Sequence, residues 1–278
     1  MMNRESKGYK IFRGVMLGIW LVITLFPLVW ILITSFKPAG SITSYPLQYW
    51  PKPFTLDNYS RLFEDSSFGT YVLNSLMISL VAGAIATVIS LLGAYVLARF
   101  TFRGRGALLM AFLVTQMIPA FIALGPLYVM MVDFGLVDSR SGLTIVYIAL
   151  CIPFCTIMLR GFFANVPAEL EEAAMVDGCN RLTALVRVIV PVMTPGIVAT
   201  FIFNFVNCWN ELFLSVTLIN SDSNKTIPAA LNGFISSFNI EWGPMSAAAV
   251  LAIIPTMILF AVASKFIVQG LTSGAVKG

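Results

Sequence analysis

Histidine is absent from this chain of 278 residues, and charged residues make up only 11% of it. A missing imidazole removes the commonest general acid–base group and the commonest metal ligand. We therefore expect neither a catalytic residue set nor a metal site. A Gly-x-x-x-x-Gly-Lys-Ser/Thr phosphate loop is also absent. The chain is thus not expected to hold ATP in that way.

Hydrophobic residues, in contrast, make up 58% of the chain, and the mean hydropathy is +0.89. The long uncharged runs exceed what a membrane of ~30 Å hydrocarbon thickness requires of a helix. Backbone groups find no water inside a bilayer, which makes helices the expected form. We predict an all-α polytopic membrane protein, a single domain over 1–278. Its six transmembrane helices are expected at 14–36, 71–98, 107–131, 141–160, 192–219 and 244–264.

Lysine and arginine are distributed unevenly between the two sides of these spans. Most of them fall in the segments that share a side with the N-terminus, such as Arg99–Arg105. Because positive charge is enriched in cytoplasmic loops, both termini are predicted to be cytoplasmic. The net charge of +4 is then a topology signal and gives no reason to expect a nucleic-acid partner.

A polar segment, 161–191, separates the fourth and fifth predicted spans. Pro167 suits a helix start, Gly178 can end that helix with a positive φ, and Asn180 can cap a second one. The pattern predicts a helix–turn–helix along the cytoplasmic face. Composition alone leaves two interpretations open, a docking element for a soluble partner and an interfacial helix that anchors the chain.

The spacing within this segment carries a resemblance. Glu172-Ala173-Ala174, then Gly178, then Val188, Val190 and Pro191 resemble the coupling motif of the membrane subunits of bacterial ABC importers, with valines where isoleucine and leucine are usual. The ending Gln269–Gly278 and the triplet Trp209-Asn210-Glu211 resemble carbohydrate permeases of the maltose G-subunit type.

This resemblance implies a permease subunit of an ATP-driven, binding-protein-dependent sugar or oligosaccharide importer in the bacterial cell membrane. The implied partners are a second permease subunit, two copies of a cytoplasmic ATPase that holds ATP and Mg, and an extracytoplasmic sugar-binding protein. The coupling residues implied are Glu172, Ala173, Ala174, Asp177, Gly178 and Pro191. The tail residues implied to contact the ATPase are Gln269, Gly270, Lys277 and Gly278.

The fifth predicted span adds a polar stripe. At about 100° per residue, side chains of one face line up while Trp209 points away. Polar groups in a membrane are costly and usually face a cavity or a partner. Two interpretations remain, a lining of the translocation path and hydrogen bonding between helices. The candidate path residues are Thr200, Asn204, Asn207, Asn210, Glu211 and Ser215.

Two other classes are weighed against the importer. A secondary carrier needs an ion or proton site, for which only Glu211 is available in the spans. A membrane-embedded enzyme needs paired acids, an activated nucleophile or a metal site, and the sequence offers none of these.

Overall fold

Helices account for almost the whole chain. The computed structural model describes residues 7–64, 66–235 and 240–275, with side chains as far as 264 apart from Ala120. The chain is 79% helical, with no strand in the ranges described. The all-α fold predicted from hydropathy is confirmed.

Five helices in the described part of the chain are long and apolar enough to cross a membrane, or six if one bent pair is counted as a span. The five are α1 (Lys7–Ser35), α4 (Phe68–Arg99), α7 (Arg140–Phe163), the continuous helix of α9, η2 and α10 (Arg181–Asn210) and α13 (Trp242–Ala275).

The bent pair occupies the predicted span 107–131. It consists of α5 (Arg105–Met117) and α6 (Leu124–Asp133), linked by the 3₁₀ turn η1 (Ala120–Ala123) and bent by 90°. Pro119 lies at the break, where its missing N–H and its ring disfavour a continued helix. The third span is therefore two helices rather than one.

The predicted span 192–219 is also divided. Helix α10 (Val190–Asn210) ends where Glu211 adopts an extended backbone, and α11 (Phe213–Leu218) follows. The helical phase of α10 therefore does not continue into α11.

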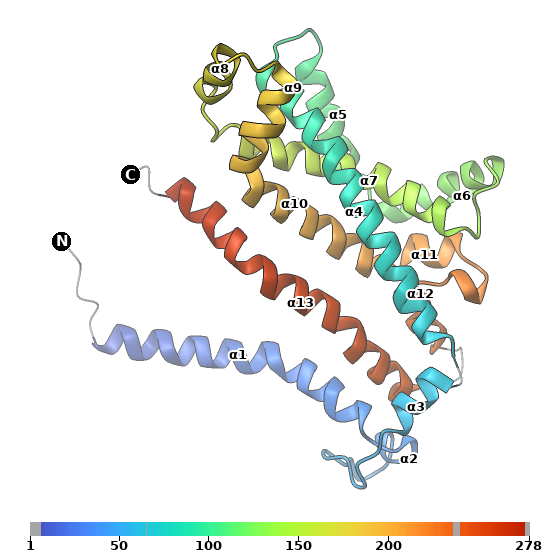
Figure 1. Cartoon of the computed structure of the whole chain (residues 1–278). Helices are drawn as coiled ribbons and strands as arrows, with labels where there is room; N and C mark the ends of the chain where they lie inside the picture. Colours follow the sequence, from blue (N-terminus) through green and yellow to red (C-terminus); the bar gives the residue numbers. More distant parts are fainter. Residues whose placement is uncertain (1–6, 65, 236–239, 276–278) are drawn as a thin grey trace. The chain divides into compact units, whose positions relative to one another are not determined.

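Two compact units make up the chain (Figure 1). The first comprises residues 1–67 and 231–253, and the second comprises 68–230 and 254–278, so α13 contributes to both. The sequence analysis did not identify this division.

In the first unit, the connection that follows α1 is built around buried polar groups. Its helices are α2 (Ala39–Ile42) and α3 (Asp57–Glu64). The side-chain amide of the buried Asn58 donates to the carbonyls of Ser35 and Lys37, each at 2.8 Å. Nζ of Lys37 donates to the Gln48 carbonyl at 2.6 Å. Burial lowers the pKa of this lysine, and the hydrogen bond offsets part of that cost.

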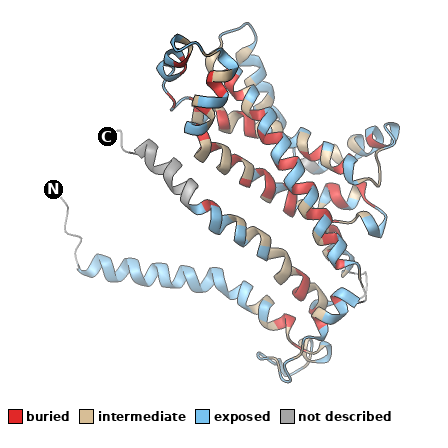
Figure 2. Ribbon diagram, viewed as in Figure 1, coloured by how far each residue is buried: buried red, intermediate tan, exposed pale blue. Residues whose placement is uncertain are grey.

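In the second unit, α4 packs against both α7 and α10. The buried residues gather along these three helices (Figure 2). Close approach depends on small residues: a Cβ on Gly196 of α10 would lie 2.6 Å from the Phe162 ring of α7. The shorter elements of this unit are α8 (Glu169–Val176), α9 (Arg181–Ala184), η2 (Leu185–Ile189), η3 (Asp222–Asn224) and the start of α12 (Ile227–Gly233).

Among the residues described in the second unit, buried apolar clusters include one near each end of α4. One joins the early part of α4 to α7 and α11, and includes Ile78, Leu143 and Leu218. The other joins the Arg99 end of α4 to α7 and η2, and includes Phe163 and Ile189. Both ends of α4 are thus fixed by apolar packing.

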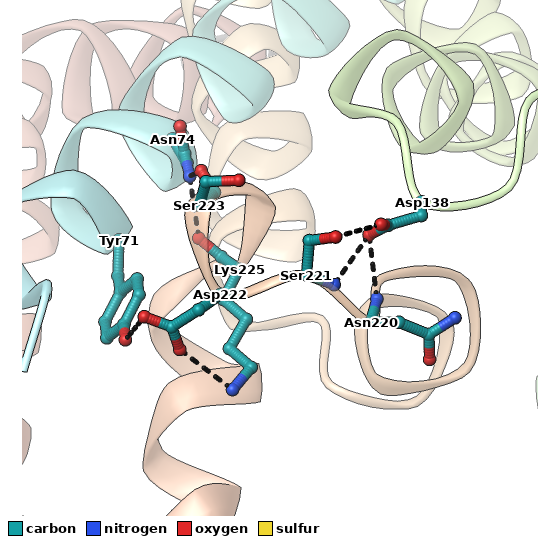
Figure 3. Close-up of polar contacts among 8 residues, drawn as sticks. All are labelled: Tyr71, Asn74, Asp138, Asn220, Ser221, Asp222, Ser223 and Lys225. Carbon is teal, nitrogen blue, oxygen red and sulfur yellow. Dashed lines mark hydrogen bonds and ion pairs between the residues drawn. The ribbon is translucent and has the colours of Figure 1, made fainter.

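The loop 219–226 is held in place by hydrogen bonds from α4 and from the connection between α6 and α7 (Figure 3). The Asn74 amide donates to the carbonyls of Ser223 and Lys225, each at 2.9 Å. The Tyr71 hydroxyl donates to the Asp222 carboxylate at 2.6 Å. Loop carbonyls and a carboxylate are therefore satisfied by side chains near the start of α4.

Asp138 holds the same loop from the connection between α6 and α7. Its carboxylate accepts the N–H groups of Asn220 and Ser221 at 2.9 and 2.8 Å, and also the Ser221 hydroxyl. Asp138 has a φ of +55°, a left-handed conformation that aspartate tolerates better than most residues. The Ser221 hydroxyl, followed by its N–H, lowers the pKa of Asp138 below the ordinary 3.8.

We predict that Asp138→Asn destabilises the chain by about 1 kcal/mol, a modest value because the site is partly exposed. Asparagine tolerates the positive φ, so the change removes mainly the charge. Because the folded pKa is lowered, the ionised carboxylate stabilises the fold above pH 3.8 and this contribution is lost as pH falls through and below that value. The measurement is thermal unfolding of the purified protein followed by tryptophan fluorescence.

The control is Asp133→Asn, which removes an equivalent charge from the exposed last residue of α6. The difference between wild type and Asp138→Asn should narrow from about pH 5 to about pH 3. Equal unfolding midpoints for Asp138→Asn and the wild type at neutral pH would contradict the assignment.

Candidate functional site

The segment between α7 and α10 forms the predicted helix–turn–helix. Helix α8 ends at a turn in which the N–H of Gly178 donates to the Met175 carbonyl at 3.1 Å and the N–H of Cys179 donates to the Ala174 carbonyl at 3.0 Å. Gly178 has a φ of +90°, which a residue with a Cβ rarely adopts. The Asn180 side chain then accepts the Thr183 N–H at 2.8 Å and starts α9.

The predicted coupling residues do not all face the same way. Glu172, Ala173, Asp177 and Gly178 are exposed, whereas Ala174 is buried against the rest of the unit. Val176, next to Asp177, is 86% exposed. The turn therefore presents a mixed acidic and apolar surface.

Pro191 lies in the first turn of α10 rather than ahead of the helix, because η2 joins α9 and α10 without a break. The turn η2 is a π-helix in which the Val190 N–H donates to the Leu185 carbonyl. This wider turn immediately precedes the proline, which has no N–H to give. The boundary that we predicted at 191 is therefore absent.

Glu171 is the functional candidate that sequence reasoning did not single out. Its carboxylate accepts a hydrogen bond from the Tyr95 hydroxyl, and Oε2 lies 3.3 Å from Nε of Arg99. The Arg99 N–H is not aligned for a hydrogen bond at that distance, so the contact is an ion pair. The only feature of the sequence that could have indicated its role is its position directly before Glu172-Ala173-Ala174.

The polar stripe predicted on the fifth span separates into three environments. Thr200 is buried and its hydroxyl donates back to the Gly196 carbonyl at 2.8 Å. Ser215 is buried on α11 and shares a hydrogen bond with Thr226. Asn207 and Asn210 are exposed. The end of α10 at Asn210 separates Ser215 from the stripe, because the helical phase used for the prediction stops there, whereas Thr200 and Asn207 differ in burial within α10 itself.

Asn204 joins the three central helices of the second unit. Its amide donates to the Thr87 hydroxyl of α4 at 3.1 Å, and its oxygen accepts from the Cys155 thiol of α7 at 2.6 Å. The side chain is fully buried. For this residue the geometry matches hydrogen bonding between helices.

Glu211 occupies the break between α10 and α11. Its carboxylate accepts the N–H groups of Leu214 and Ser215 at 3.0 and 3.1 Å, and the Tyr147 hydroxyl at 3.0 Å. A carboxylate at a helix N-terminus satisfies backbone N–H groups that have no partner within the helix. Glu211 thus caps the N-terminus of α11, and this structural role explains why an acidic residue lies at the break.

A cleft of about 470 Å³ opens beside this break. Its walls combine aromatic rings with amides and one carboxylate, and the rings of Phe154 and Phe203 stack with centroids 4.5 Å apart. Such a mixture suits a ligand with apolar faces and hydroxyl groups. The residues that line the cleft include Gln116, Tyr147, Phe203, Asn207 and Glu211.

The predicted tail falls largely outside what the structure describes. Gln269 and Gly270 lie on the backbone of α13 but beyond the last described side chain, and Lys277 and Gly278 are outside the described residues. The predicted role of the tail is therefore not examined by the geometry.

This chain is similar in sequence to known transport permeases of bacteria. The diacetylchitobiose uptake system permease DasC of Streptomyces coelicolor is 40% identical over 253 residues, covering 91% of this chain and 92% of the relative. The sulfoquinovosyl glycerol transport system permease SmoH of Agrobacterium fabrum is 36% identical over 269 residues, covering 97% and 94%. Both relatives are transport permeases rather than enzymes.

A solved bacterial ABC transporter that imports the acidic polysaccharide alginate shares the fold. Its matching chain has a TM-score of 0.82 at 24% identity, covering 96% of this chain and 99% of that chain. Residues 89–273, a stretch that includes the helix–turn–helix and the cleft, match a family described as binding-protein-dependent transport system inner membrane component. This chain belongs to that family, the permease subunits of ABC importers.

Proposed function

We propose that this permease imports a sugar or oligosaccharide. The support is that relatives over nearly the whole chain carry glycosides in their names, diacetylchitobiose for one and sulfoquinovosyl glycerol for another. The mixed aromatic and amide lining of the cleft agrees with such a substrate, because sugar rings stack on aromatic faces and their hydroxyl groups bond to amides. The narrower likeness to the maltose G-subunit type stays a prediction.

The family membership removes the two alternatives raised by the sequence, a secondary carrier and a membrane-embedded enzyme. The chain is a multi-pass membrane protein of the inner membrane component family. We propose that both of its termini are cytoplasmic.

On this proposal the exposed turn around Gly178 docks on one of two cytoplasmic ATPase subunits, which bind ATP and Mg. A second permease subunit completes the path, and an extracytoplasmic binding protein delivers the sugar. The cleft beside Asn207 and Glu211 forms this chain's part of the path.

The single observation that carries the coupling role is the exposed pair Val176 and Asp177 at a turn where the chain of this membrane protein reverses direction. The tail Gln269–Gly278 is proposed to contact the ATPase subunits.

The importer is tested by reconstituting the whole complex in proteoliposomes and offering radiolabelled oligosaccharides, among them diacetylchitobiose. We expect accumulation of at least one glycoside that requires both internal ATP and the external binding protein. A proton or sodium gradient without ATP should drive none. Uptake driven by an ion gradient alone, or an ATP-dependent uptake restricted to solutes other than sugars, would contradict the proposal.

We predict that Gly178→Leu reduces uptake by at least about tenfold, because a Cβ at φ +90° costs of order 1–3 kcal/mol and reshapes the turn. Membrane insertion should be unchanged, since nothing else lies within 4 Å of the position of that Cβ. The measurements are sugar uptake and the sugar-stimulated ATPase activity of the complex. Gly161→Leu is the matched control, at an equally open glycine with an ordinary φ. Normal stimulation in Gly178→Leu would show that the turn is not the coupling element.

We predict that Asn207→Cys reacts with a small polar thiol reagent, because Asn207 is exposed and faces the cleft. Trp209→Cys should react at least about tenfold more slowly, because Trp209 is only 2% exposed and stacks on Phe205. Both are made in a cysteine-free background and measured by mass spectrometry in membranes. Equal rates at the two positions would argue against a water-accessible cleft.

A further inference from the structure

Helix α8 has one face exposed and one face packed against the rest of the unit. Its adjacent residues Glu171 and Glu172 lie on different faces. Glu172 is exposed, whereas Glu171 is only 5% exposed and lies on the same side as the buried Ala174. A carboxylate that only interacts favourably with the N-terminal end of the helix dipole has no need to be buried. A buried carboxylate needs a partner, and Glu171 finds both of its partners on α4.

The contacts tie the helix–turn–helix to the last turns of α4. Tyr95 donates its hydroxyl hydrogen bond to Glu171, and Arg99 forms the ion pair. Nη2 of Arg99 also donates at 2.9 Å to the carbonyl of Val166, which lies just ahead of α8. One guanidinium therefore holds both the entry to α8 and its buried carboxylate.

The second helix of the segment is tied to the same place. The guanidinium carbon of Arg181, at the start of α9, lies 4.9 Å from the centroid of the Phe100 ring, and Phe100 directly follows α4. The Tyr95 and Phe163 rings, 5.9 Å apart, pack beneath the ion pair. This apolar floor weakens solvent screening of the Glu171–Arg99 pair.

Helix α4 is suited to carry a displacement away from this point. It runs through 32 residues, roughly 48 Å at 1.5 Å per residue. No proline interrupts it, whereas α1, α7, α10 and α13 each contain at least one. Near its other end, Tyr71 and Asn74 hold the loop 219–226. The same helix is thus attached to the turn at one end and to that loop at the other.

We propose that Glu171 is a positioning residue that passes movement of the docked turn to α4 through its contacts with Tyr95 and Arg99. This rests on the proposed docking of the turn on an ATPase. Glu172 and Asp177 meet the partner, and Glu171 makes α8 and α4 move together. Without the Glu171 contacts, α8 still moves with the ATPase but α4 no longer moves with α8. ATP is then hydrolysed without a matching amount of sugar transport.

The test uses the complete transporter in proteoliposomes and compares Glu171→Gln with Glu169→Gln. Glu169 also lies in the first turn of α8 but is exposed, so the control removes the same charge from the same helix. Two quantities are measured, the amount of ATPase that copurifies and the number of sugar molecules imported per ATP hydrolysed. Glu171→Gln should keep wild-type copurification and lower the sugar-to-ATP ratio about tenfold. Glu169→Gln should change neither.

A second variant protects the test against misfolding. The exchange Glu171→Arg with Arg99→Glu restores opposite charges across the same contact and should recover part of the ratio lost in Glu171→Gln. An unchanged sugar-to-ATP ratio in Glu171→Gln would overturn the proposal. So would loss of copurification and uptake together in both Glu171→Gln and the exchange variant, since that pattern indicates a purely structural role. A wild-type complex that binds no ATPase would instead refute the proposed function.

Discussion

The packing of α4 between α7 and α10 is the contact on which the second unit depends. Small residues make it possible: Ala82 and Ala86 are fully buried, and a Cβ on Gly83 would already lie 3.4 Å from α10. In a bilayer, lipid tails are as apolar as leucine, so helices gain little from hydrophobic transfer and associate by close van der Waals contact. The small residues supply that contact, and the apolar clusters at both ends of α4 extend it.

Two polar side chains within this packing, Asn204 and Glu211, find partners on neighbouring elements. Asn204 bonds to both α4 and α7, and Glu211 takes donors from α7 and from the start of α11. An unsatisfied amide or carboxylate at membrane depth costs several kcal/mol. These residues therefore fix the relative register of the helices as well as their own positions. Only the outward members of the predicted stripe, such as Asn207, remain available to the cleft.

The two ends of α4 are built differently from its middle. Near Phe68 the partners are backbone carbonyls of the loop 219–226, and near Arg99 they are a buried carboxylate and a carbonyl beside α8. Hydrogen bonds and ion pairs are directional, so each end of α4 holds its attached segment in a defined register. The polar contacts in the middle of α4 instead join it to α10 and α7, through Asn204 with Thr87 and through Ser90 with the Ile152 carbonyl.

The sequence by itself determined the spans, the helix–turn–helix with its turn at Gly178, and the family, because hydropathy, glycine conformation and motif spacing are local properties. Only the tertiary structure decided that the third span breaks near Pro119 and that the stripe on α10 stops at Asn210, since helical phase cannot be extrapolated across an unseen break. The tertiary structure also decided which of two neighbouring glutamates is buried. Glu171 and Glu172 are the same residue type in the same turn, and only the position of Tyr95 and Arg99, some 75 residues earlier in the chain, buries one and leaves the other exposed.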